Sequence, residues 1–139
     1  MPTGEDAFGL GSHHVQLARP EGREAEARHF YQGLLGLREV VRPPVLRGRG
    51  GAWFRGPMLE LHLGVDDEFR AARKAHPGIL TDRLDDLAER LTGAKVEVLW
   101  DVDLPGFRRF YASDPFGNRL EFLQPAGSGP RPEEVYSKQ

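Results

Sequence analysis

Two histidines and two glutamates stand at matching places in the two halves of the chain. They are His14, Glu60, His76 and Glu121, and the residue numbers differ by 46 within the first pair and by 45 within the second. Imidazole nitrogen and carboxylate oxygen, without sulfur, suit zinc, nickel, manganese, cobalt or iron, and residue type does not choose among these metals. We predict that the four side chains bind one divalent metal ion, because a cation offsets the cost of burying them together.

His62 leaves this ligand set open. Residues two apart on a strand share a face, so His62 is expected beside Glu60 and could replace it as a ligand. It could also carry a proton beside the metal. The competing interpretation for the two acids is an ordinary ion pair across a sheet, with Arg55 or Arg119 as the partner.

The elements that position these residues repeat along the chain as strand, helix and further strands. In the first half we expect a strand over 13–18, a helix from about Glu21, a short strand over 37–42, a loop over 43–51, and paired strands over 52–54 and 58–63. The loop is predicted from its prolines and glycines, which central strands exclude. The helix has Ala27, Phe30, Tyr31 and Leu34 on one apolar stripe.

The second half repeats this order. A strand is expected over 76–80, a helix containing Leu84, Leu87, Ala88 and Leu91 at helical spacing, a strand over 95–100, and a hairpin of 108–113 with 119–123 around the turn 114–118. Thr81 or Asp82 is the candidate N-cap and Gly93 the candidate exit. A unit of about 60 residues is marginal alone, so the two halves are expected to share one interior.

Composition excludes several classes of protein. The 139 residues fit one domain, and a net charge of −2 disfavours a general nucleic-acid binder. No run approaches the roughly 18 apolar residues of a membrane span, and the acidic N-terminus does not resemble a secretory signal. The absence of cysteine excludes disulfides, thiol catalysis and Cys-ligated metals. We expect a cytoplasmic protein with neither nucleic acid nor membrane as a partner.

Three segments resemble the vicinal oxygen chelate superfamily, which includes glyoxalase I, fosfomycin-resistance enzymes, bleomycin-resistance proteins and extradiol dioxygenases. They are HHVQL at 13–17, HFYQGLLGL at 29–37 and DPFGNRLEF at 114–122. The resemblance implies an α+β fold of two βαβββ modules that form a curled mixed sheet around a metal site. The single domain would span 12–125, with modules 12–65 and 74–125 and flexible tails at 1–11 and 126–139.

The resemblance also implies roles for the four residues. His14 and His76 are similar to the opening-strand ligands of the two modules, and Glu121 to the closing carboxylate ligand. Glu60 matches the glutamate that glyoxalase I uses as a fourth ligand, while fosfomycin-resistance enzymes manage without it. One departure is Pro77, which cannot donate a ladder hydrogen bond beside His76.

The function implied is a metal-dependent enzyme of the glyoxalase type, acting on a small substrate with vicinal oxygens by lyase, isomerase or thiol-transferase chemistry. Glu60 and Glu121 would be catalytic and move a proton, and Arg109 and Tyr111 would bind the substrate, including an anionic one. A dioxygenase is less favoured, because those relatives are longer and carry further catalytic residues. The alternative is a binding protein of the bleomycin-resistance type that sequesters a small molecule. A homodimer is expected, with each metal site inside one chain or shared by two.

Overall fold

Both halves of the chain fold into four strands and a covering helix, described by a computed structural model for residues 8–48 and 50–127. The first module contains β1 (Val15–Arg19), α1 (Glu24–Arg28) continuing as the π-helix η1 (His29–Leu34), β2 (Arg38–Val40), α2 (Pro44–Arg47), β3 (Ala52–Arg55) and β4 (Glu60–Val65). The second contains β5 (Gly78–Leu80), α3 (Leu84–Gly93), β6 (Leu99–Asp101), β7 (Phe107–Ser113) and β8 (Arg119–Pro125). Residues 1–7 and 128–139 of the expected tails lie outside the described residues.

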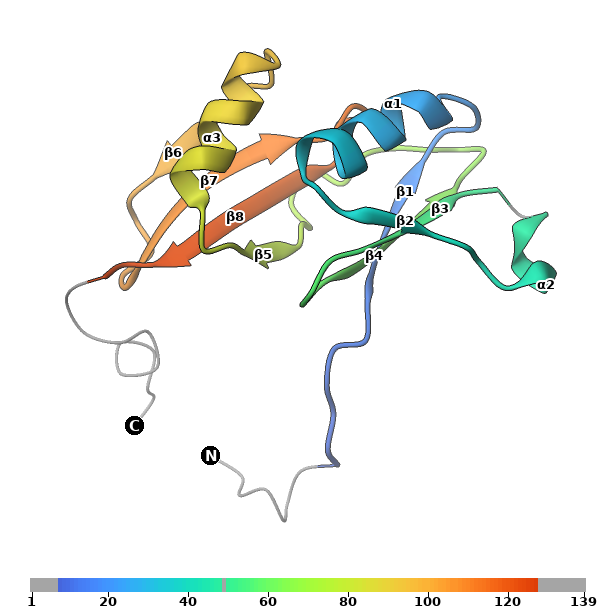
Figure 1. Ribbon diagram of the computed structural model, residues 1–139, viewed down its shortest axis with the longest axis horizontal. Coiled ribbons are helices and arrows are strands. Elements are labelled where there is room, and N and C mark those ends of the chain that lie inside the picture. The colour runs from blue at the N-terminus through green and yellow to red at the C-terminus, as the bar shows by residue number, and fades with distance from the viewer. Residues whose placement is uncertain (1–7, 49, 128–139) are drawn as a thin grey trace.

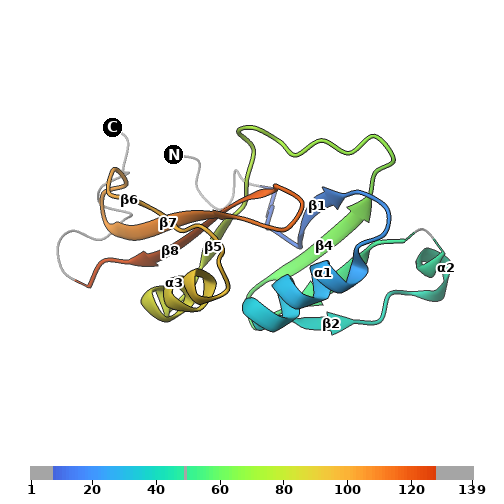
Figure 2. The same ribbon diagram turned by 90° about the horizontal axis from the view of Figure 1, so that it is seen from above.

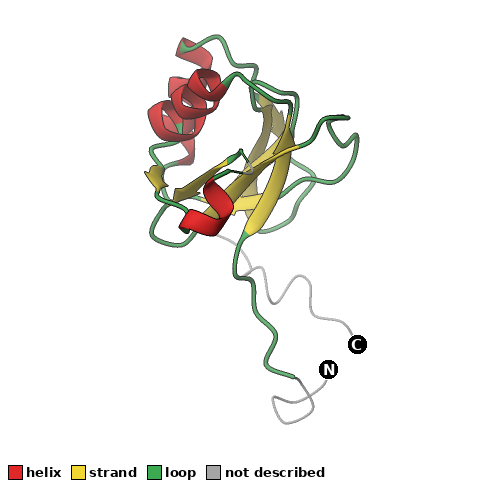
Figure 3. Ribbon diagram, turned by 90° about the vertical axis from the view of Figure 1, so that its right-hand side faces the viewer, coloured by secondary structure: helices red, strands yellow, loops and turns green. Residues whose placement is uncertain are grey.

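The two sheets have the same topology. Their strand orders are β1-β4-β3-β2 and β5-β8-β7-β6, and in each the opening strand runs parallel to the fourth while the other pairs are antiparallel. The modules lie side by side (Figures 1 and 2), and α1 with η1 and α3 lie on the same side of the strands (Figure 3). The predicted α+β fold of two βαβββ modules is confirmed, and its strands form two separate mixed sheets.

Several element boundaries differ from the expected ones, and three of the differences bear on the site or the loops. The predicted loop 43–51 contains the short helix α2, because Pro44 stands at the first helical position, where its missing N–H costs nothing. β6 begins at Leu99, well after the expected residue 95. His14 lies directly before β1, and His76 lies two residues before β5, so neither lies within its strand. Both side chains therefore stand at strand entrances.

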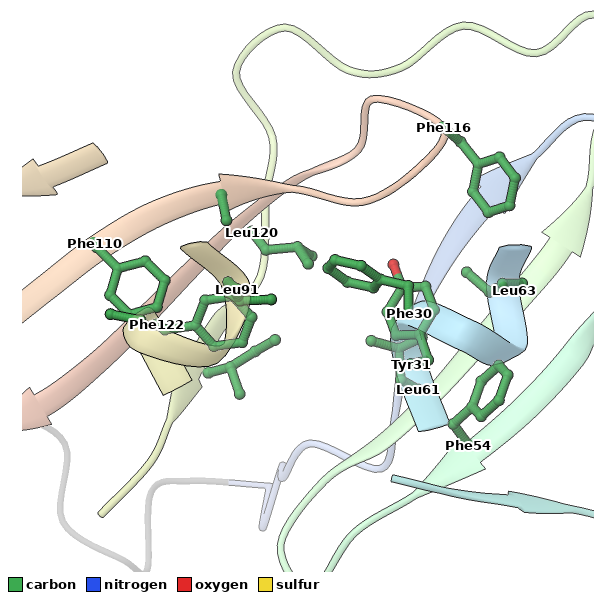
Figure 4. Packing of buried hydrophobic residues seen from close by; sticks show 14 of the residues in the cluster. Phe30, Tyr31, Phe54, Leu61, Leu63, Leu91, Phe110, Phe116, Leu120 and Phe122 are labelled. Carbon is green, nitrogen blue, oxygen red and sulfur yellow. The ribbon is translucent and has the colours of Figure 1, made fainter. Parts of the chain in front are cut away.

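Each sheet buries one face against its own helix. Leu61, Leu63 and Phe54 of the first sheet are at most 2% exposed and pack against Phe30 and Tyr31. In the second sheet Phe110, Leu120 and Phe122 pack against Leu84 and Leu91 of α3. Figure 4 shows these two groups of side chains in the one cluster that spans the modules. The opposite face of each sheet is left for polar side chains.

A buried polar network fastens the tip of the β7–β8 hairpin to the first module. Tyr31 donates its hydroxyl proton to Asp114 Oδ2 at 2.6 Å, and Asp114 Oδ1 accepts the backbone N–H groups of Phe116 and Asn118. The Asn118 amide donates to Ala18 O at 2.8 Å and to Asp114 Oδ2 at 2.9 Å. This network joins the FY and DPFGN segments that carry the resemblance. It also fixes the hairpin that carries Glu121.

No helix in the described part of the chain is long and apolar enough to cross a membrane.

Candidate functional site

Strand alternation places the predicted ligands on the polar face of each sheet. Glu60 and His62 of β4 alternate with the buried Leu61 and Leu63, as the sequence predicts. In β8, Glu121 stands between Leu120 and Phe122, which face α3. The acids are nevertheless well covered, with side-chain exposures of 15% for Glu60 and 10% for Glu121. Their carboxylates are therefore only partly hydrated.

The first cluster consists of His14, Trp53, Arg55, Glu60 and His62. Glu60 accepts from Arg55 Nε at 2.7 Å through one oxygen and contacts His62 Nε2 at 2.9 Å through the other. The His62 ring lies between two others, with its centroid 4.0 Å from that of Trp53 and 4.2 Å from that of His14. The register sets this stack, because Trp53 pairs with His62 across β3 and β4.

Arg55 also sets the charge state of Glu60. The Arg55 hydrogen bond, and after it the His62 hydrogen bond, lowers the pKa of Glu60 from 4.5 to about 2. Glu60 is therefore ionised in acidic solution as well as at neutral pH, and it offers an anionic oxygen. The expected ion pair between Glu60 and Arg55 is present. Glu60 therefore makes an ordinary ion pair across the sheet and is at the same time a candidate metal ligand.

The second cluster consists of His76, Asp101, Arg109, Tyr111 and Glu121. Glu121 Oε1 lies 2.9 Å from His76 Nε2, and Glu121 Oε2 accepts from Arg109 at 3.0 Å. Arg109 also donates to Asp101, so its guanidinium is shared between two carboxylates. The Tyr111 ring meets His76 edge to face at 5.5 Å. Glu121 thus pairs with Arg109, whereas Arg119 forms no ion pair with it.

The two clusters repeat one arrangement. In each, a carboxylate on the last strand of the sheet lies between an arginine and an imidazole Nε2, at 2.9 Å from that nitrogen. The histidines that provide the nitrogen differ, because it is His62 on β4 in the first module and His76 before β5 in the second. His14, which corresponds to His76 by position, stacks on His62 instead. The two modules therefore share the arrangement of arginine, carboxylate and imidazole, but the histidine of the first module is His62 and not the expected His14.

His76 has a hydrogen-bonding problem that a cation would solve. Its Nδ1 lies 2.8 Å from the Lys74 carbonyl oxygen, which can only accept, so Nδ1 carries the proton. Its Nε2 faces Glu121 Oε1, which is also an acceptor when ionised. Either Nε2 carries a second proton, or the nitrogen and the oxygen share a cation. A ligand histidine whose other nitrogen donates to a backbone carbonyl is the usual arrangement around protein-bound metals.

The donor atoms suit a divalent metal ion, although one chain presents them in two groups. Ligands about 2.0–2.1 Å from one ion lie roughly 2.9–3.4 Å apart, which includes the 2.9 Å between His76 Nε2 and Glu121 Oε1. Within residues 8–48 and 50–127, no three His, Asp or Glu side chains form a group that could hold a metal. The structure brings His14, Glu60 and His62 together, and separately His76 and Glu121.

Several contacts of these clusters could not be identified from residue types. Trp53 packs on His62, Asp101 holds Arg109, and the Lys74 carbonyl orients His76. The signal for Trp53 is its place on the strand paired with β4, which is usable only once the register is known. Lys74 acts through its backbone, so its residue type contains no signal.

Comparisons with known proteins agree with this architecture. The family model of the Glyoxalase/Bleomycin resistance protein/Dioxygenase superfamily matches residues 11–122. The crystal structure of a glyoxalase family protein from Bacillus anthracis is 41% identical with a TM-score of 0.83, covering 86% of this chain and 98% of that one. No curated protein matches the chain.

Two more distant structures share the fold. Lactoylglutathione lyase from Agrobacterium tumefaciens is 19% identical with a TM-score of 0.64, over 84% of this chain and 95% of that one. A mutant of the fosfomycin resistance protein FosX from Listeria monocytogenes, complexed with Mn(II) and 1S,2S-dihydroxypropylphosphonic acid, is 18% identical with a TM-score of 0.68, over 91% and 97%. With the family model and the Bacillus structure, these findings show that the chain belongs to the glyoxalase/bleomycin resistance protein/dioxygenase superfamily.

Proposed function

We propose that this protein is a divalent-metal-dependent enzyme of the glyoxalase type that acts on a small substrate with neighbouring oxygen atoms. His14, His76 and Glu121 would hold the metal, with Glu60 or His62 as the fourth ligand. The observation that carries the proposal is the contact between His76 Nε2 and Glu121 Oε1, which lie 2.9 Å apart, while the other ring nitrogen of His76 is already oriented by the Lys74 carbonyl. The metal-bound FosX structure supports the choice of a divalent ion.

The bound metal would supply Lewis-acid polarisation of the substrate oxygens. Glu121 and Glu60 are the groups on this chain able to take up and return a proton, and each keeps an arginine on one side of its carboxylate. Arg109 and Tyr111 flank Glu121 and would bind or orient the substrate.

Trp53 provides a direct readout of metal binding. Its ring stacks on His62, so a change in the charge or position of that imidazole will change indole fluorescence. Since the chain has two tryptophans, a Trp100→Phe background leaves Trp53 as the only emitter. Titration with Zn²⁺, Mn²⁺, Ni²⁺ or Co²⁺ should give a saturable change that Glu121→Gln weakens. An unchanged titration in Glu121→Gln would contradict the assigned ligand.

A mixing experiment distinguishes a site within one chain from a site shared by two. In a homodimer of the His14→Ala variant, and in a homodimer of the Glu121→Gln variant, both metal sites lack a ligand. In a mixed dimer with shared sites, one site has both defects and the other has neither, so random mixing should restore about a quarter of wild-type metal binding. With sites inside each chain, mixing restores nothing. We expect the partial restoration, because each module holds an incomplete set of donors.

The competing function is sequestration of a small molecule without chemistry. Chelation separates the two, because an enzyme would lose turnover of α-hydroxy ketones, hemithioacetals or epoxyphosphonates, whereas a sequestering protein would keep its affinity for the ligand. Turnover that survives chelation would contradict the metal-dependent proposal. Ligand binding that survives chelation in a protein without turnover would favour sequestration.

A further inference from the structure

Arg119 differs from the other arginines of the second sheet in forming no ion pair with a carboxylate of the described residues. Arg109 is held by Asp101 and Glu121, and Arg108 makes two hydrogen bonds of 2.8 Å to Asp85. Arg119 forms no hydrogen bond or ion pair with any residue that the structure describes, and it is half-buried. Asp101 is the nearby acid, and the charge of Arg119 helps to lower the pKa of Asp101 without an ion pair between them. The N–H donors of this half-buried guanidinium are therefore available to a ligand anion.

Tyr111 fixes the position of this guanidinium. The Arg119 Cζ lies 4.2 Å from the centroid of the Tyr111 ring, which stabilises the cation through the ring face. This contact with the ring uses none of the N–H donors of Arg119, and a guanidinium can donate two parallel hydrogen bonds to an anion. Arg119 is therefore held in place without its donors being used.

The same two residues line a pocket next to the second cluster. The pocket has a volume of about 670 Å³, and its walls include Phe30, Leu34 and Val96 as well as the cationic side chains of Arg73 and Lys95. Its acidic lining residues are Glu97 and Asp114, and the Asp114 carboxylate is fully engaged by Tyr31, Asn118 and two backbone N–H groups. An apolar body with an anionic end matches such a lining.

Strand geometry places Arg119 on the polar face that carries Glu121. The two residues are two apart on β8, and Tyr111 is directly paired with Glu121 across the hairpin. A ligand anion at Arg119 would therefore lie next to the group assigned to proton transfer, with Tyr111 between the pocket and His76. That location distinguishes Arg119 from Arg73 and Lys95, which belong to loops.

We propose that Arg119, stacked on Tyr111, binds the anionic group of a small-molecule ligand that carries a carboxylate, phosphate or phosphonate on an apolar body. Only one part of this proposal rests on the proposed function, namely that the bound ligand is the substrate on which the Glu121 site acts. Anion binding itself depends on the pocket and on Arg119, and it does not require the metal.

The test measures binding of phenylphosphonate to metal-free protein by NMR titration, with neutral dimethyl phenylphosphonate as the comparison ligand. Arg119→Gln should weaken phenylphosphonate binding at least about tenfold, because it removes charge-assisted hydrogen bonds. The matched control is Arg108→Gln, which removes the same charge from the same hairpin but from the opposite face, and it should change affinity less than about twofold. Shifts of the Tyr111 ring protons should accompany binding.

Three results would overturn the proposal. They are equal affinity in Arg119→Gln and wild type, equal losses in Arg119→Gln and Arg108→Gln, and binding of the neutral ester as tight as that of the phosphonate. Absence of phenylphosphonate binding to wild type at millimolar concentration would overturn it as well. Metal analysis of the same samples is a separate readout, so a failure of metal binding would be recognised independently of the anion result.

Discussion

Tyr31→Phe should destabilise the protein by removing one contact of the network that fastens the β7–β8 hairpin to the first module. The Tyr31 hydroxyl is completely buried and donates to a carboxylate at 2.6 Å. A hydrogen bond to a charged group contributes about 1.5–3 kcal/mol, and we expect Tyr31→Phe to cost that amount. Asp114→Ala should cost roughly 3–5 kcal/mol, because it leaves Tyr31, Asn118 and two backbone N–H groups without their acceptor.

The assay is urea unfolding of the two single variants and the double variant, followed by tryptophan fluorescence and circular dichroism. With Asp114 already absent, Tyr31→Phe should cost almost nothing, so the coupling free energy should equal about 1.5–3 kcal/mol. Strictly additive losses, with a coupling free energy below about 0.5 kcal/mol, would refute the claim that the Tyr31–Asp114 hydrogen bond fastens the hairpin to the first module.

The same network predicts a dependence on alkaline pH. Burial, and after it the Asp114 charge, raises the pKa of Tyr31 well above 10.0. The folded-state pKa is thus above the unfolded one, so the contribution of the neutral phenol is fully present below pH 10 and is lost as the pH rises above it. The stability of wild type should therefore fall more steeply above pH 10 than that of Tyr31→Phe. Parallel curves for the two proteins would contradict this assignment.

Three further predictions concern the core, a turn and an ion pair. Leu91→Ala should cost about 2–5 kcal/mol in urea unfolding, because its side chain is fully buried between α3 and the second sheet; a cost below 1 kcal/mol would contradict that packing. Gly51→Ala should destabilise by at least about 1 kcal/mol, since Gly51 has a φ of +87° and an added Cβ would lie 2.2 Å from the Leu63 carbonyl oxygen; a thermal midpoint equal to wild type would be inconsistent with it. The pKa of Glu60 is lowered to about 2, so the stability from its pairing with Arg55 is present above pH 4.5 and is lost as the pH falls through 2. The free energy of unfolding of Glu60→Gln, measured over the same acid range, should lack this loss. An equal loss in wild type and Glu60→Gln would count against the pairing.

Local patterns in the sequence predict the faces of the strands and the hairpin. The alternation of Leu61 and Leu63 with Glu60 and His62 is enough to place the two polar side chains together, because a strand has a period of two. The turn residues between β7 and β8 predict the hairpin for the same local reason. The sequence is therefore sufficient to predict which face of a strand a side chain occupies and where a tight turn lies.

The ion pair of Arg55 with Glu60 is predictable from residue types, but other contacts across strands depend on the register. The pairing of Arg109 with Glu121 depends on the register of β7 against β8, in which Glu121 is opposite Tyr111. The stacking of Trp53 on His62 likewise depends on the register of β3 against β4. The prolines of 43–47 exclude a central strand but also suit a helix start, so residue type does not distinguish a loop from the short helix α2.

The central claim, a divalent metal bound by His14, His76 and Glu121, is tested most directly by the metal content of the purified protein. Wild type, His14→Ala, Glu121→Gln and the control Arg108→Gln would be purified without tag or chelator and analysed by mass spectrometry before and after metal reloading. We predict about one divalent ion per chain in wild type and in Arg108→Gln, and loss in the other two variants. Metal in wild type no higher than in His14→Ala and Glu121→Gln, even after reloading, would contradict the claim.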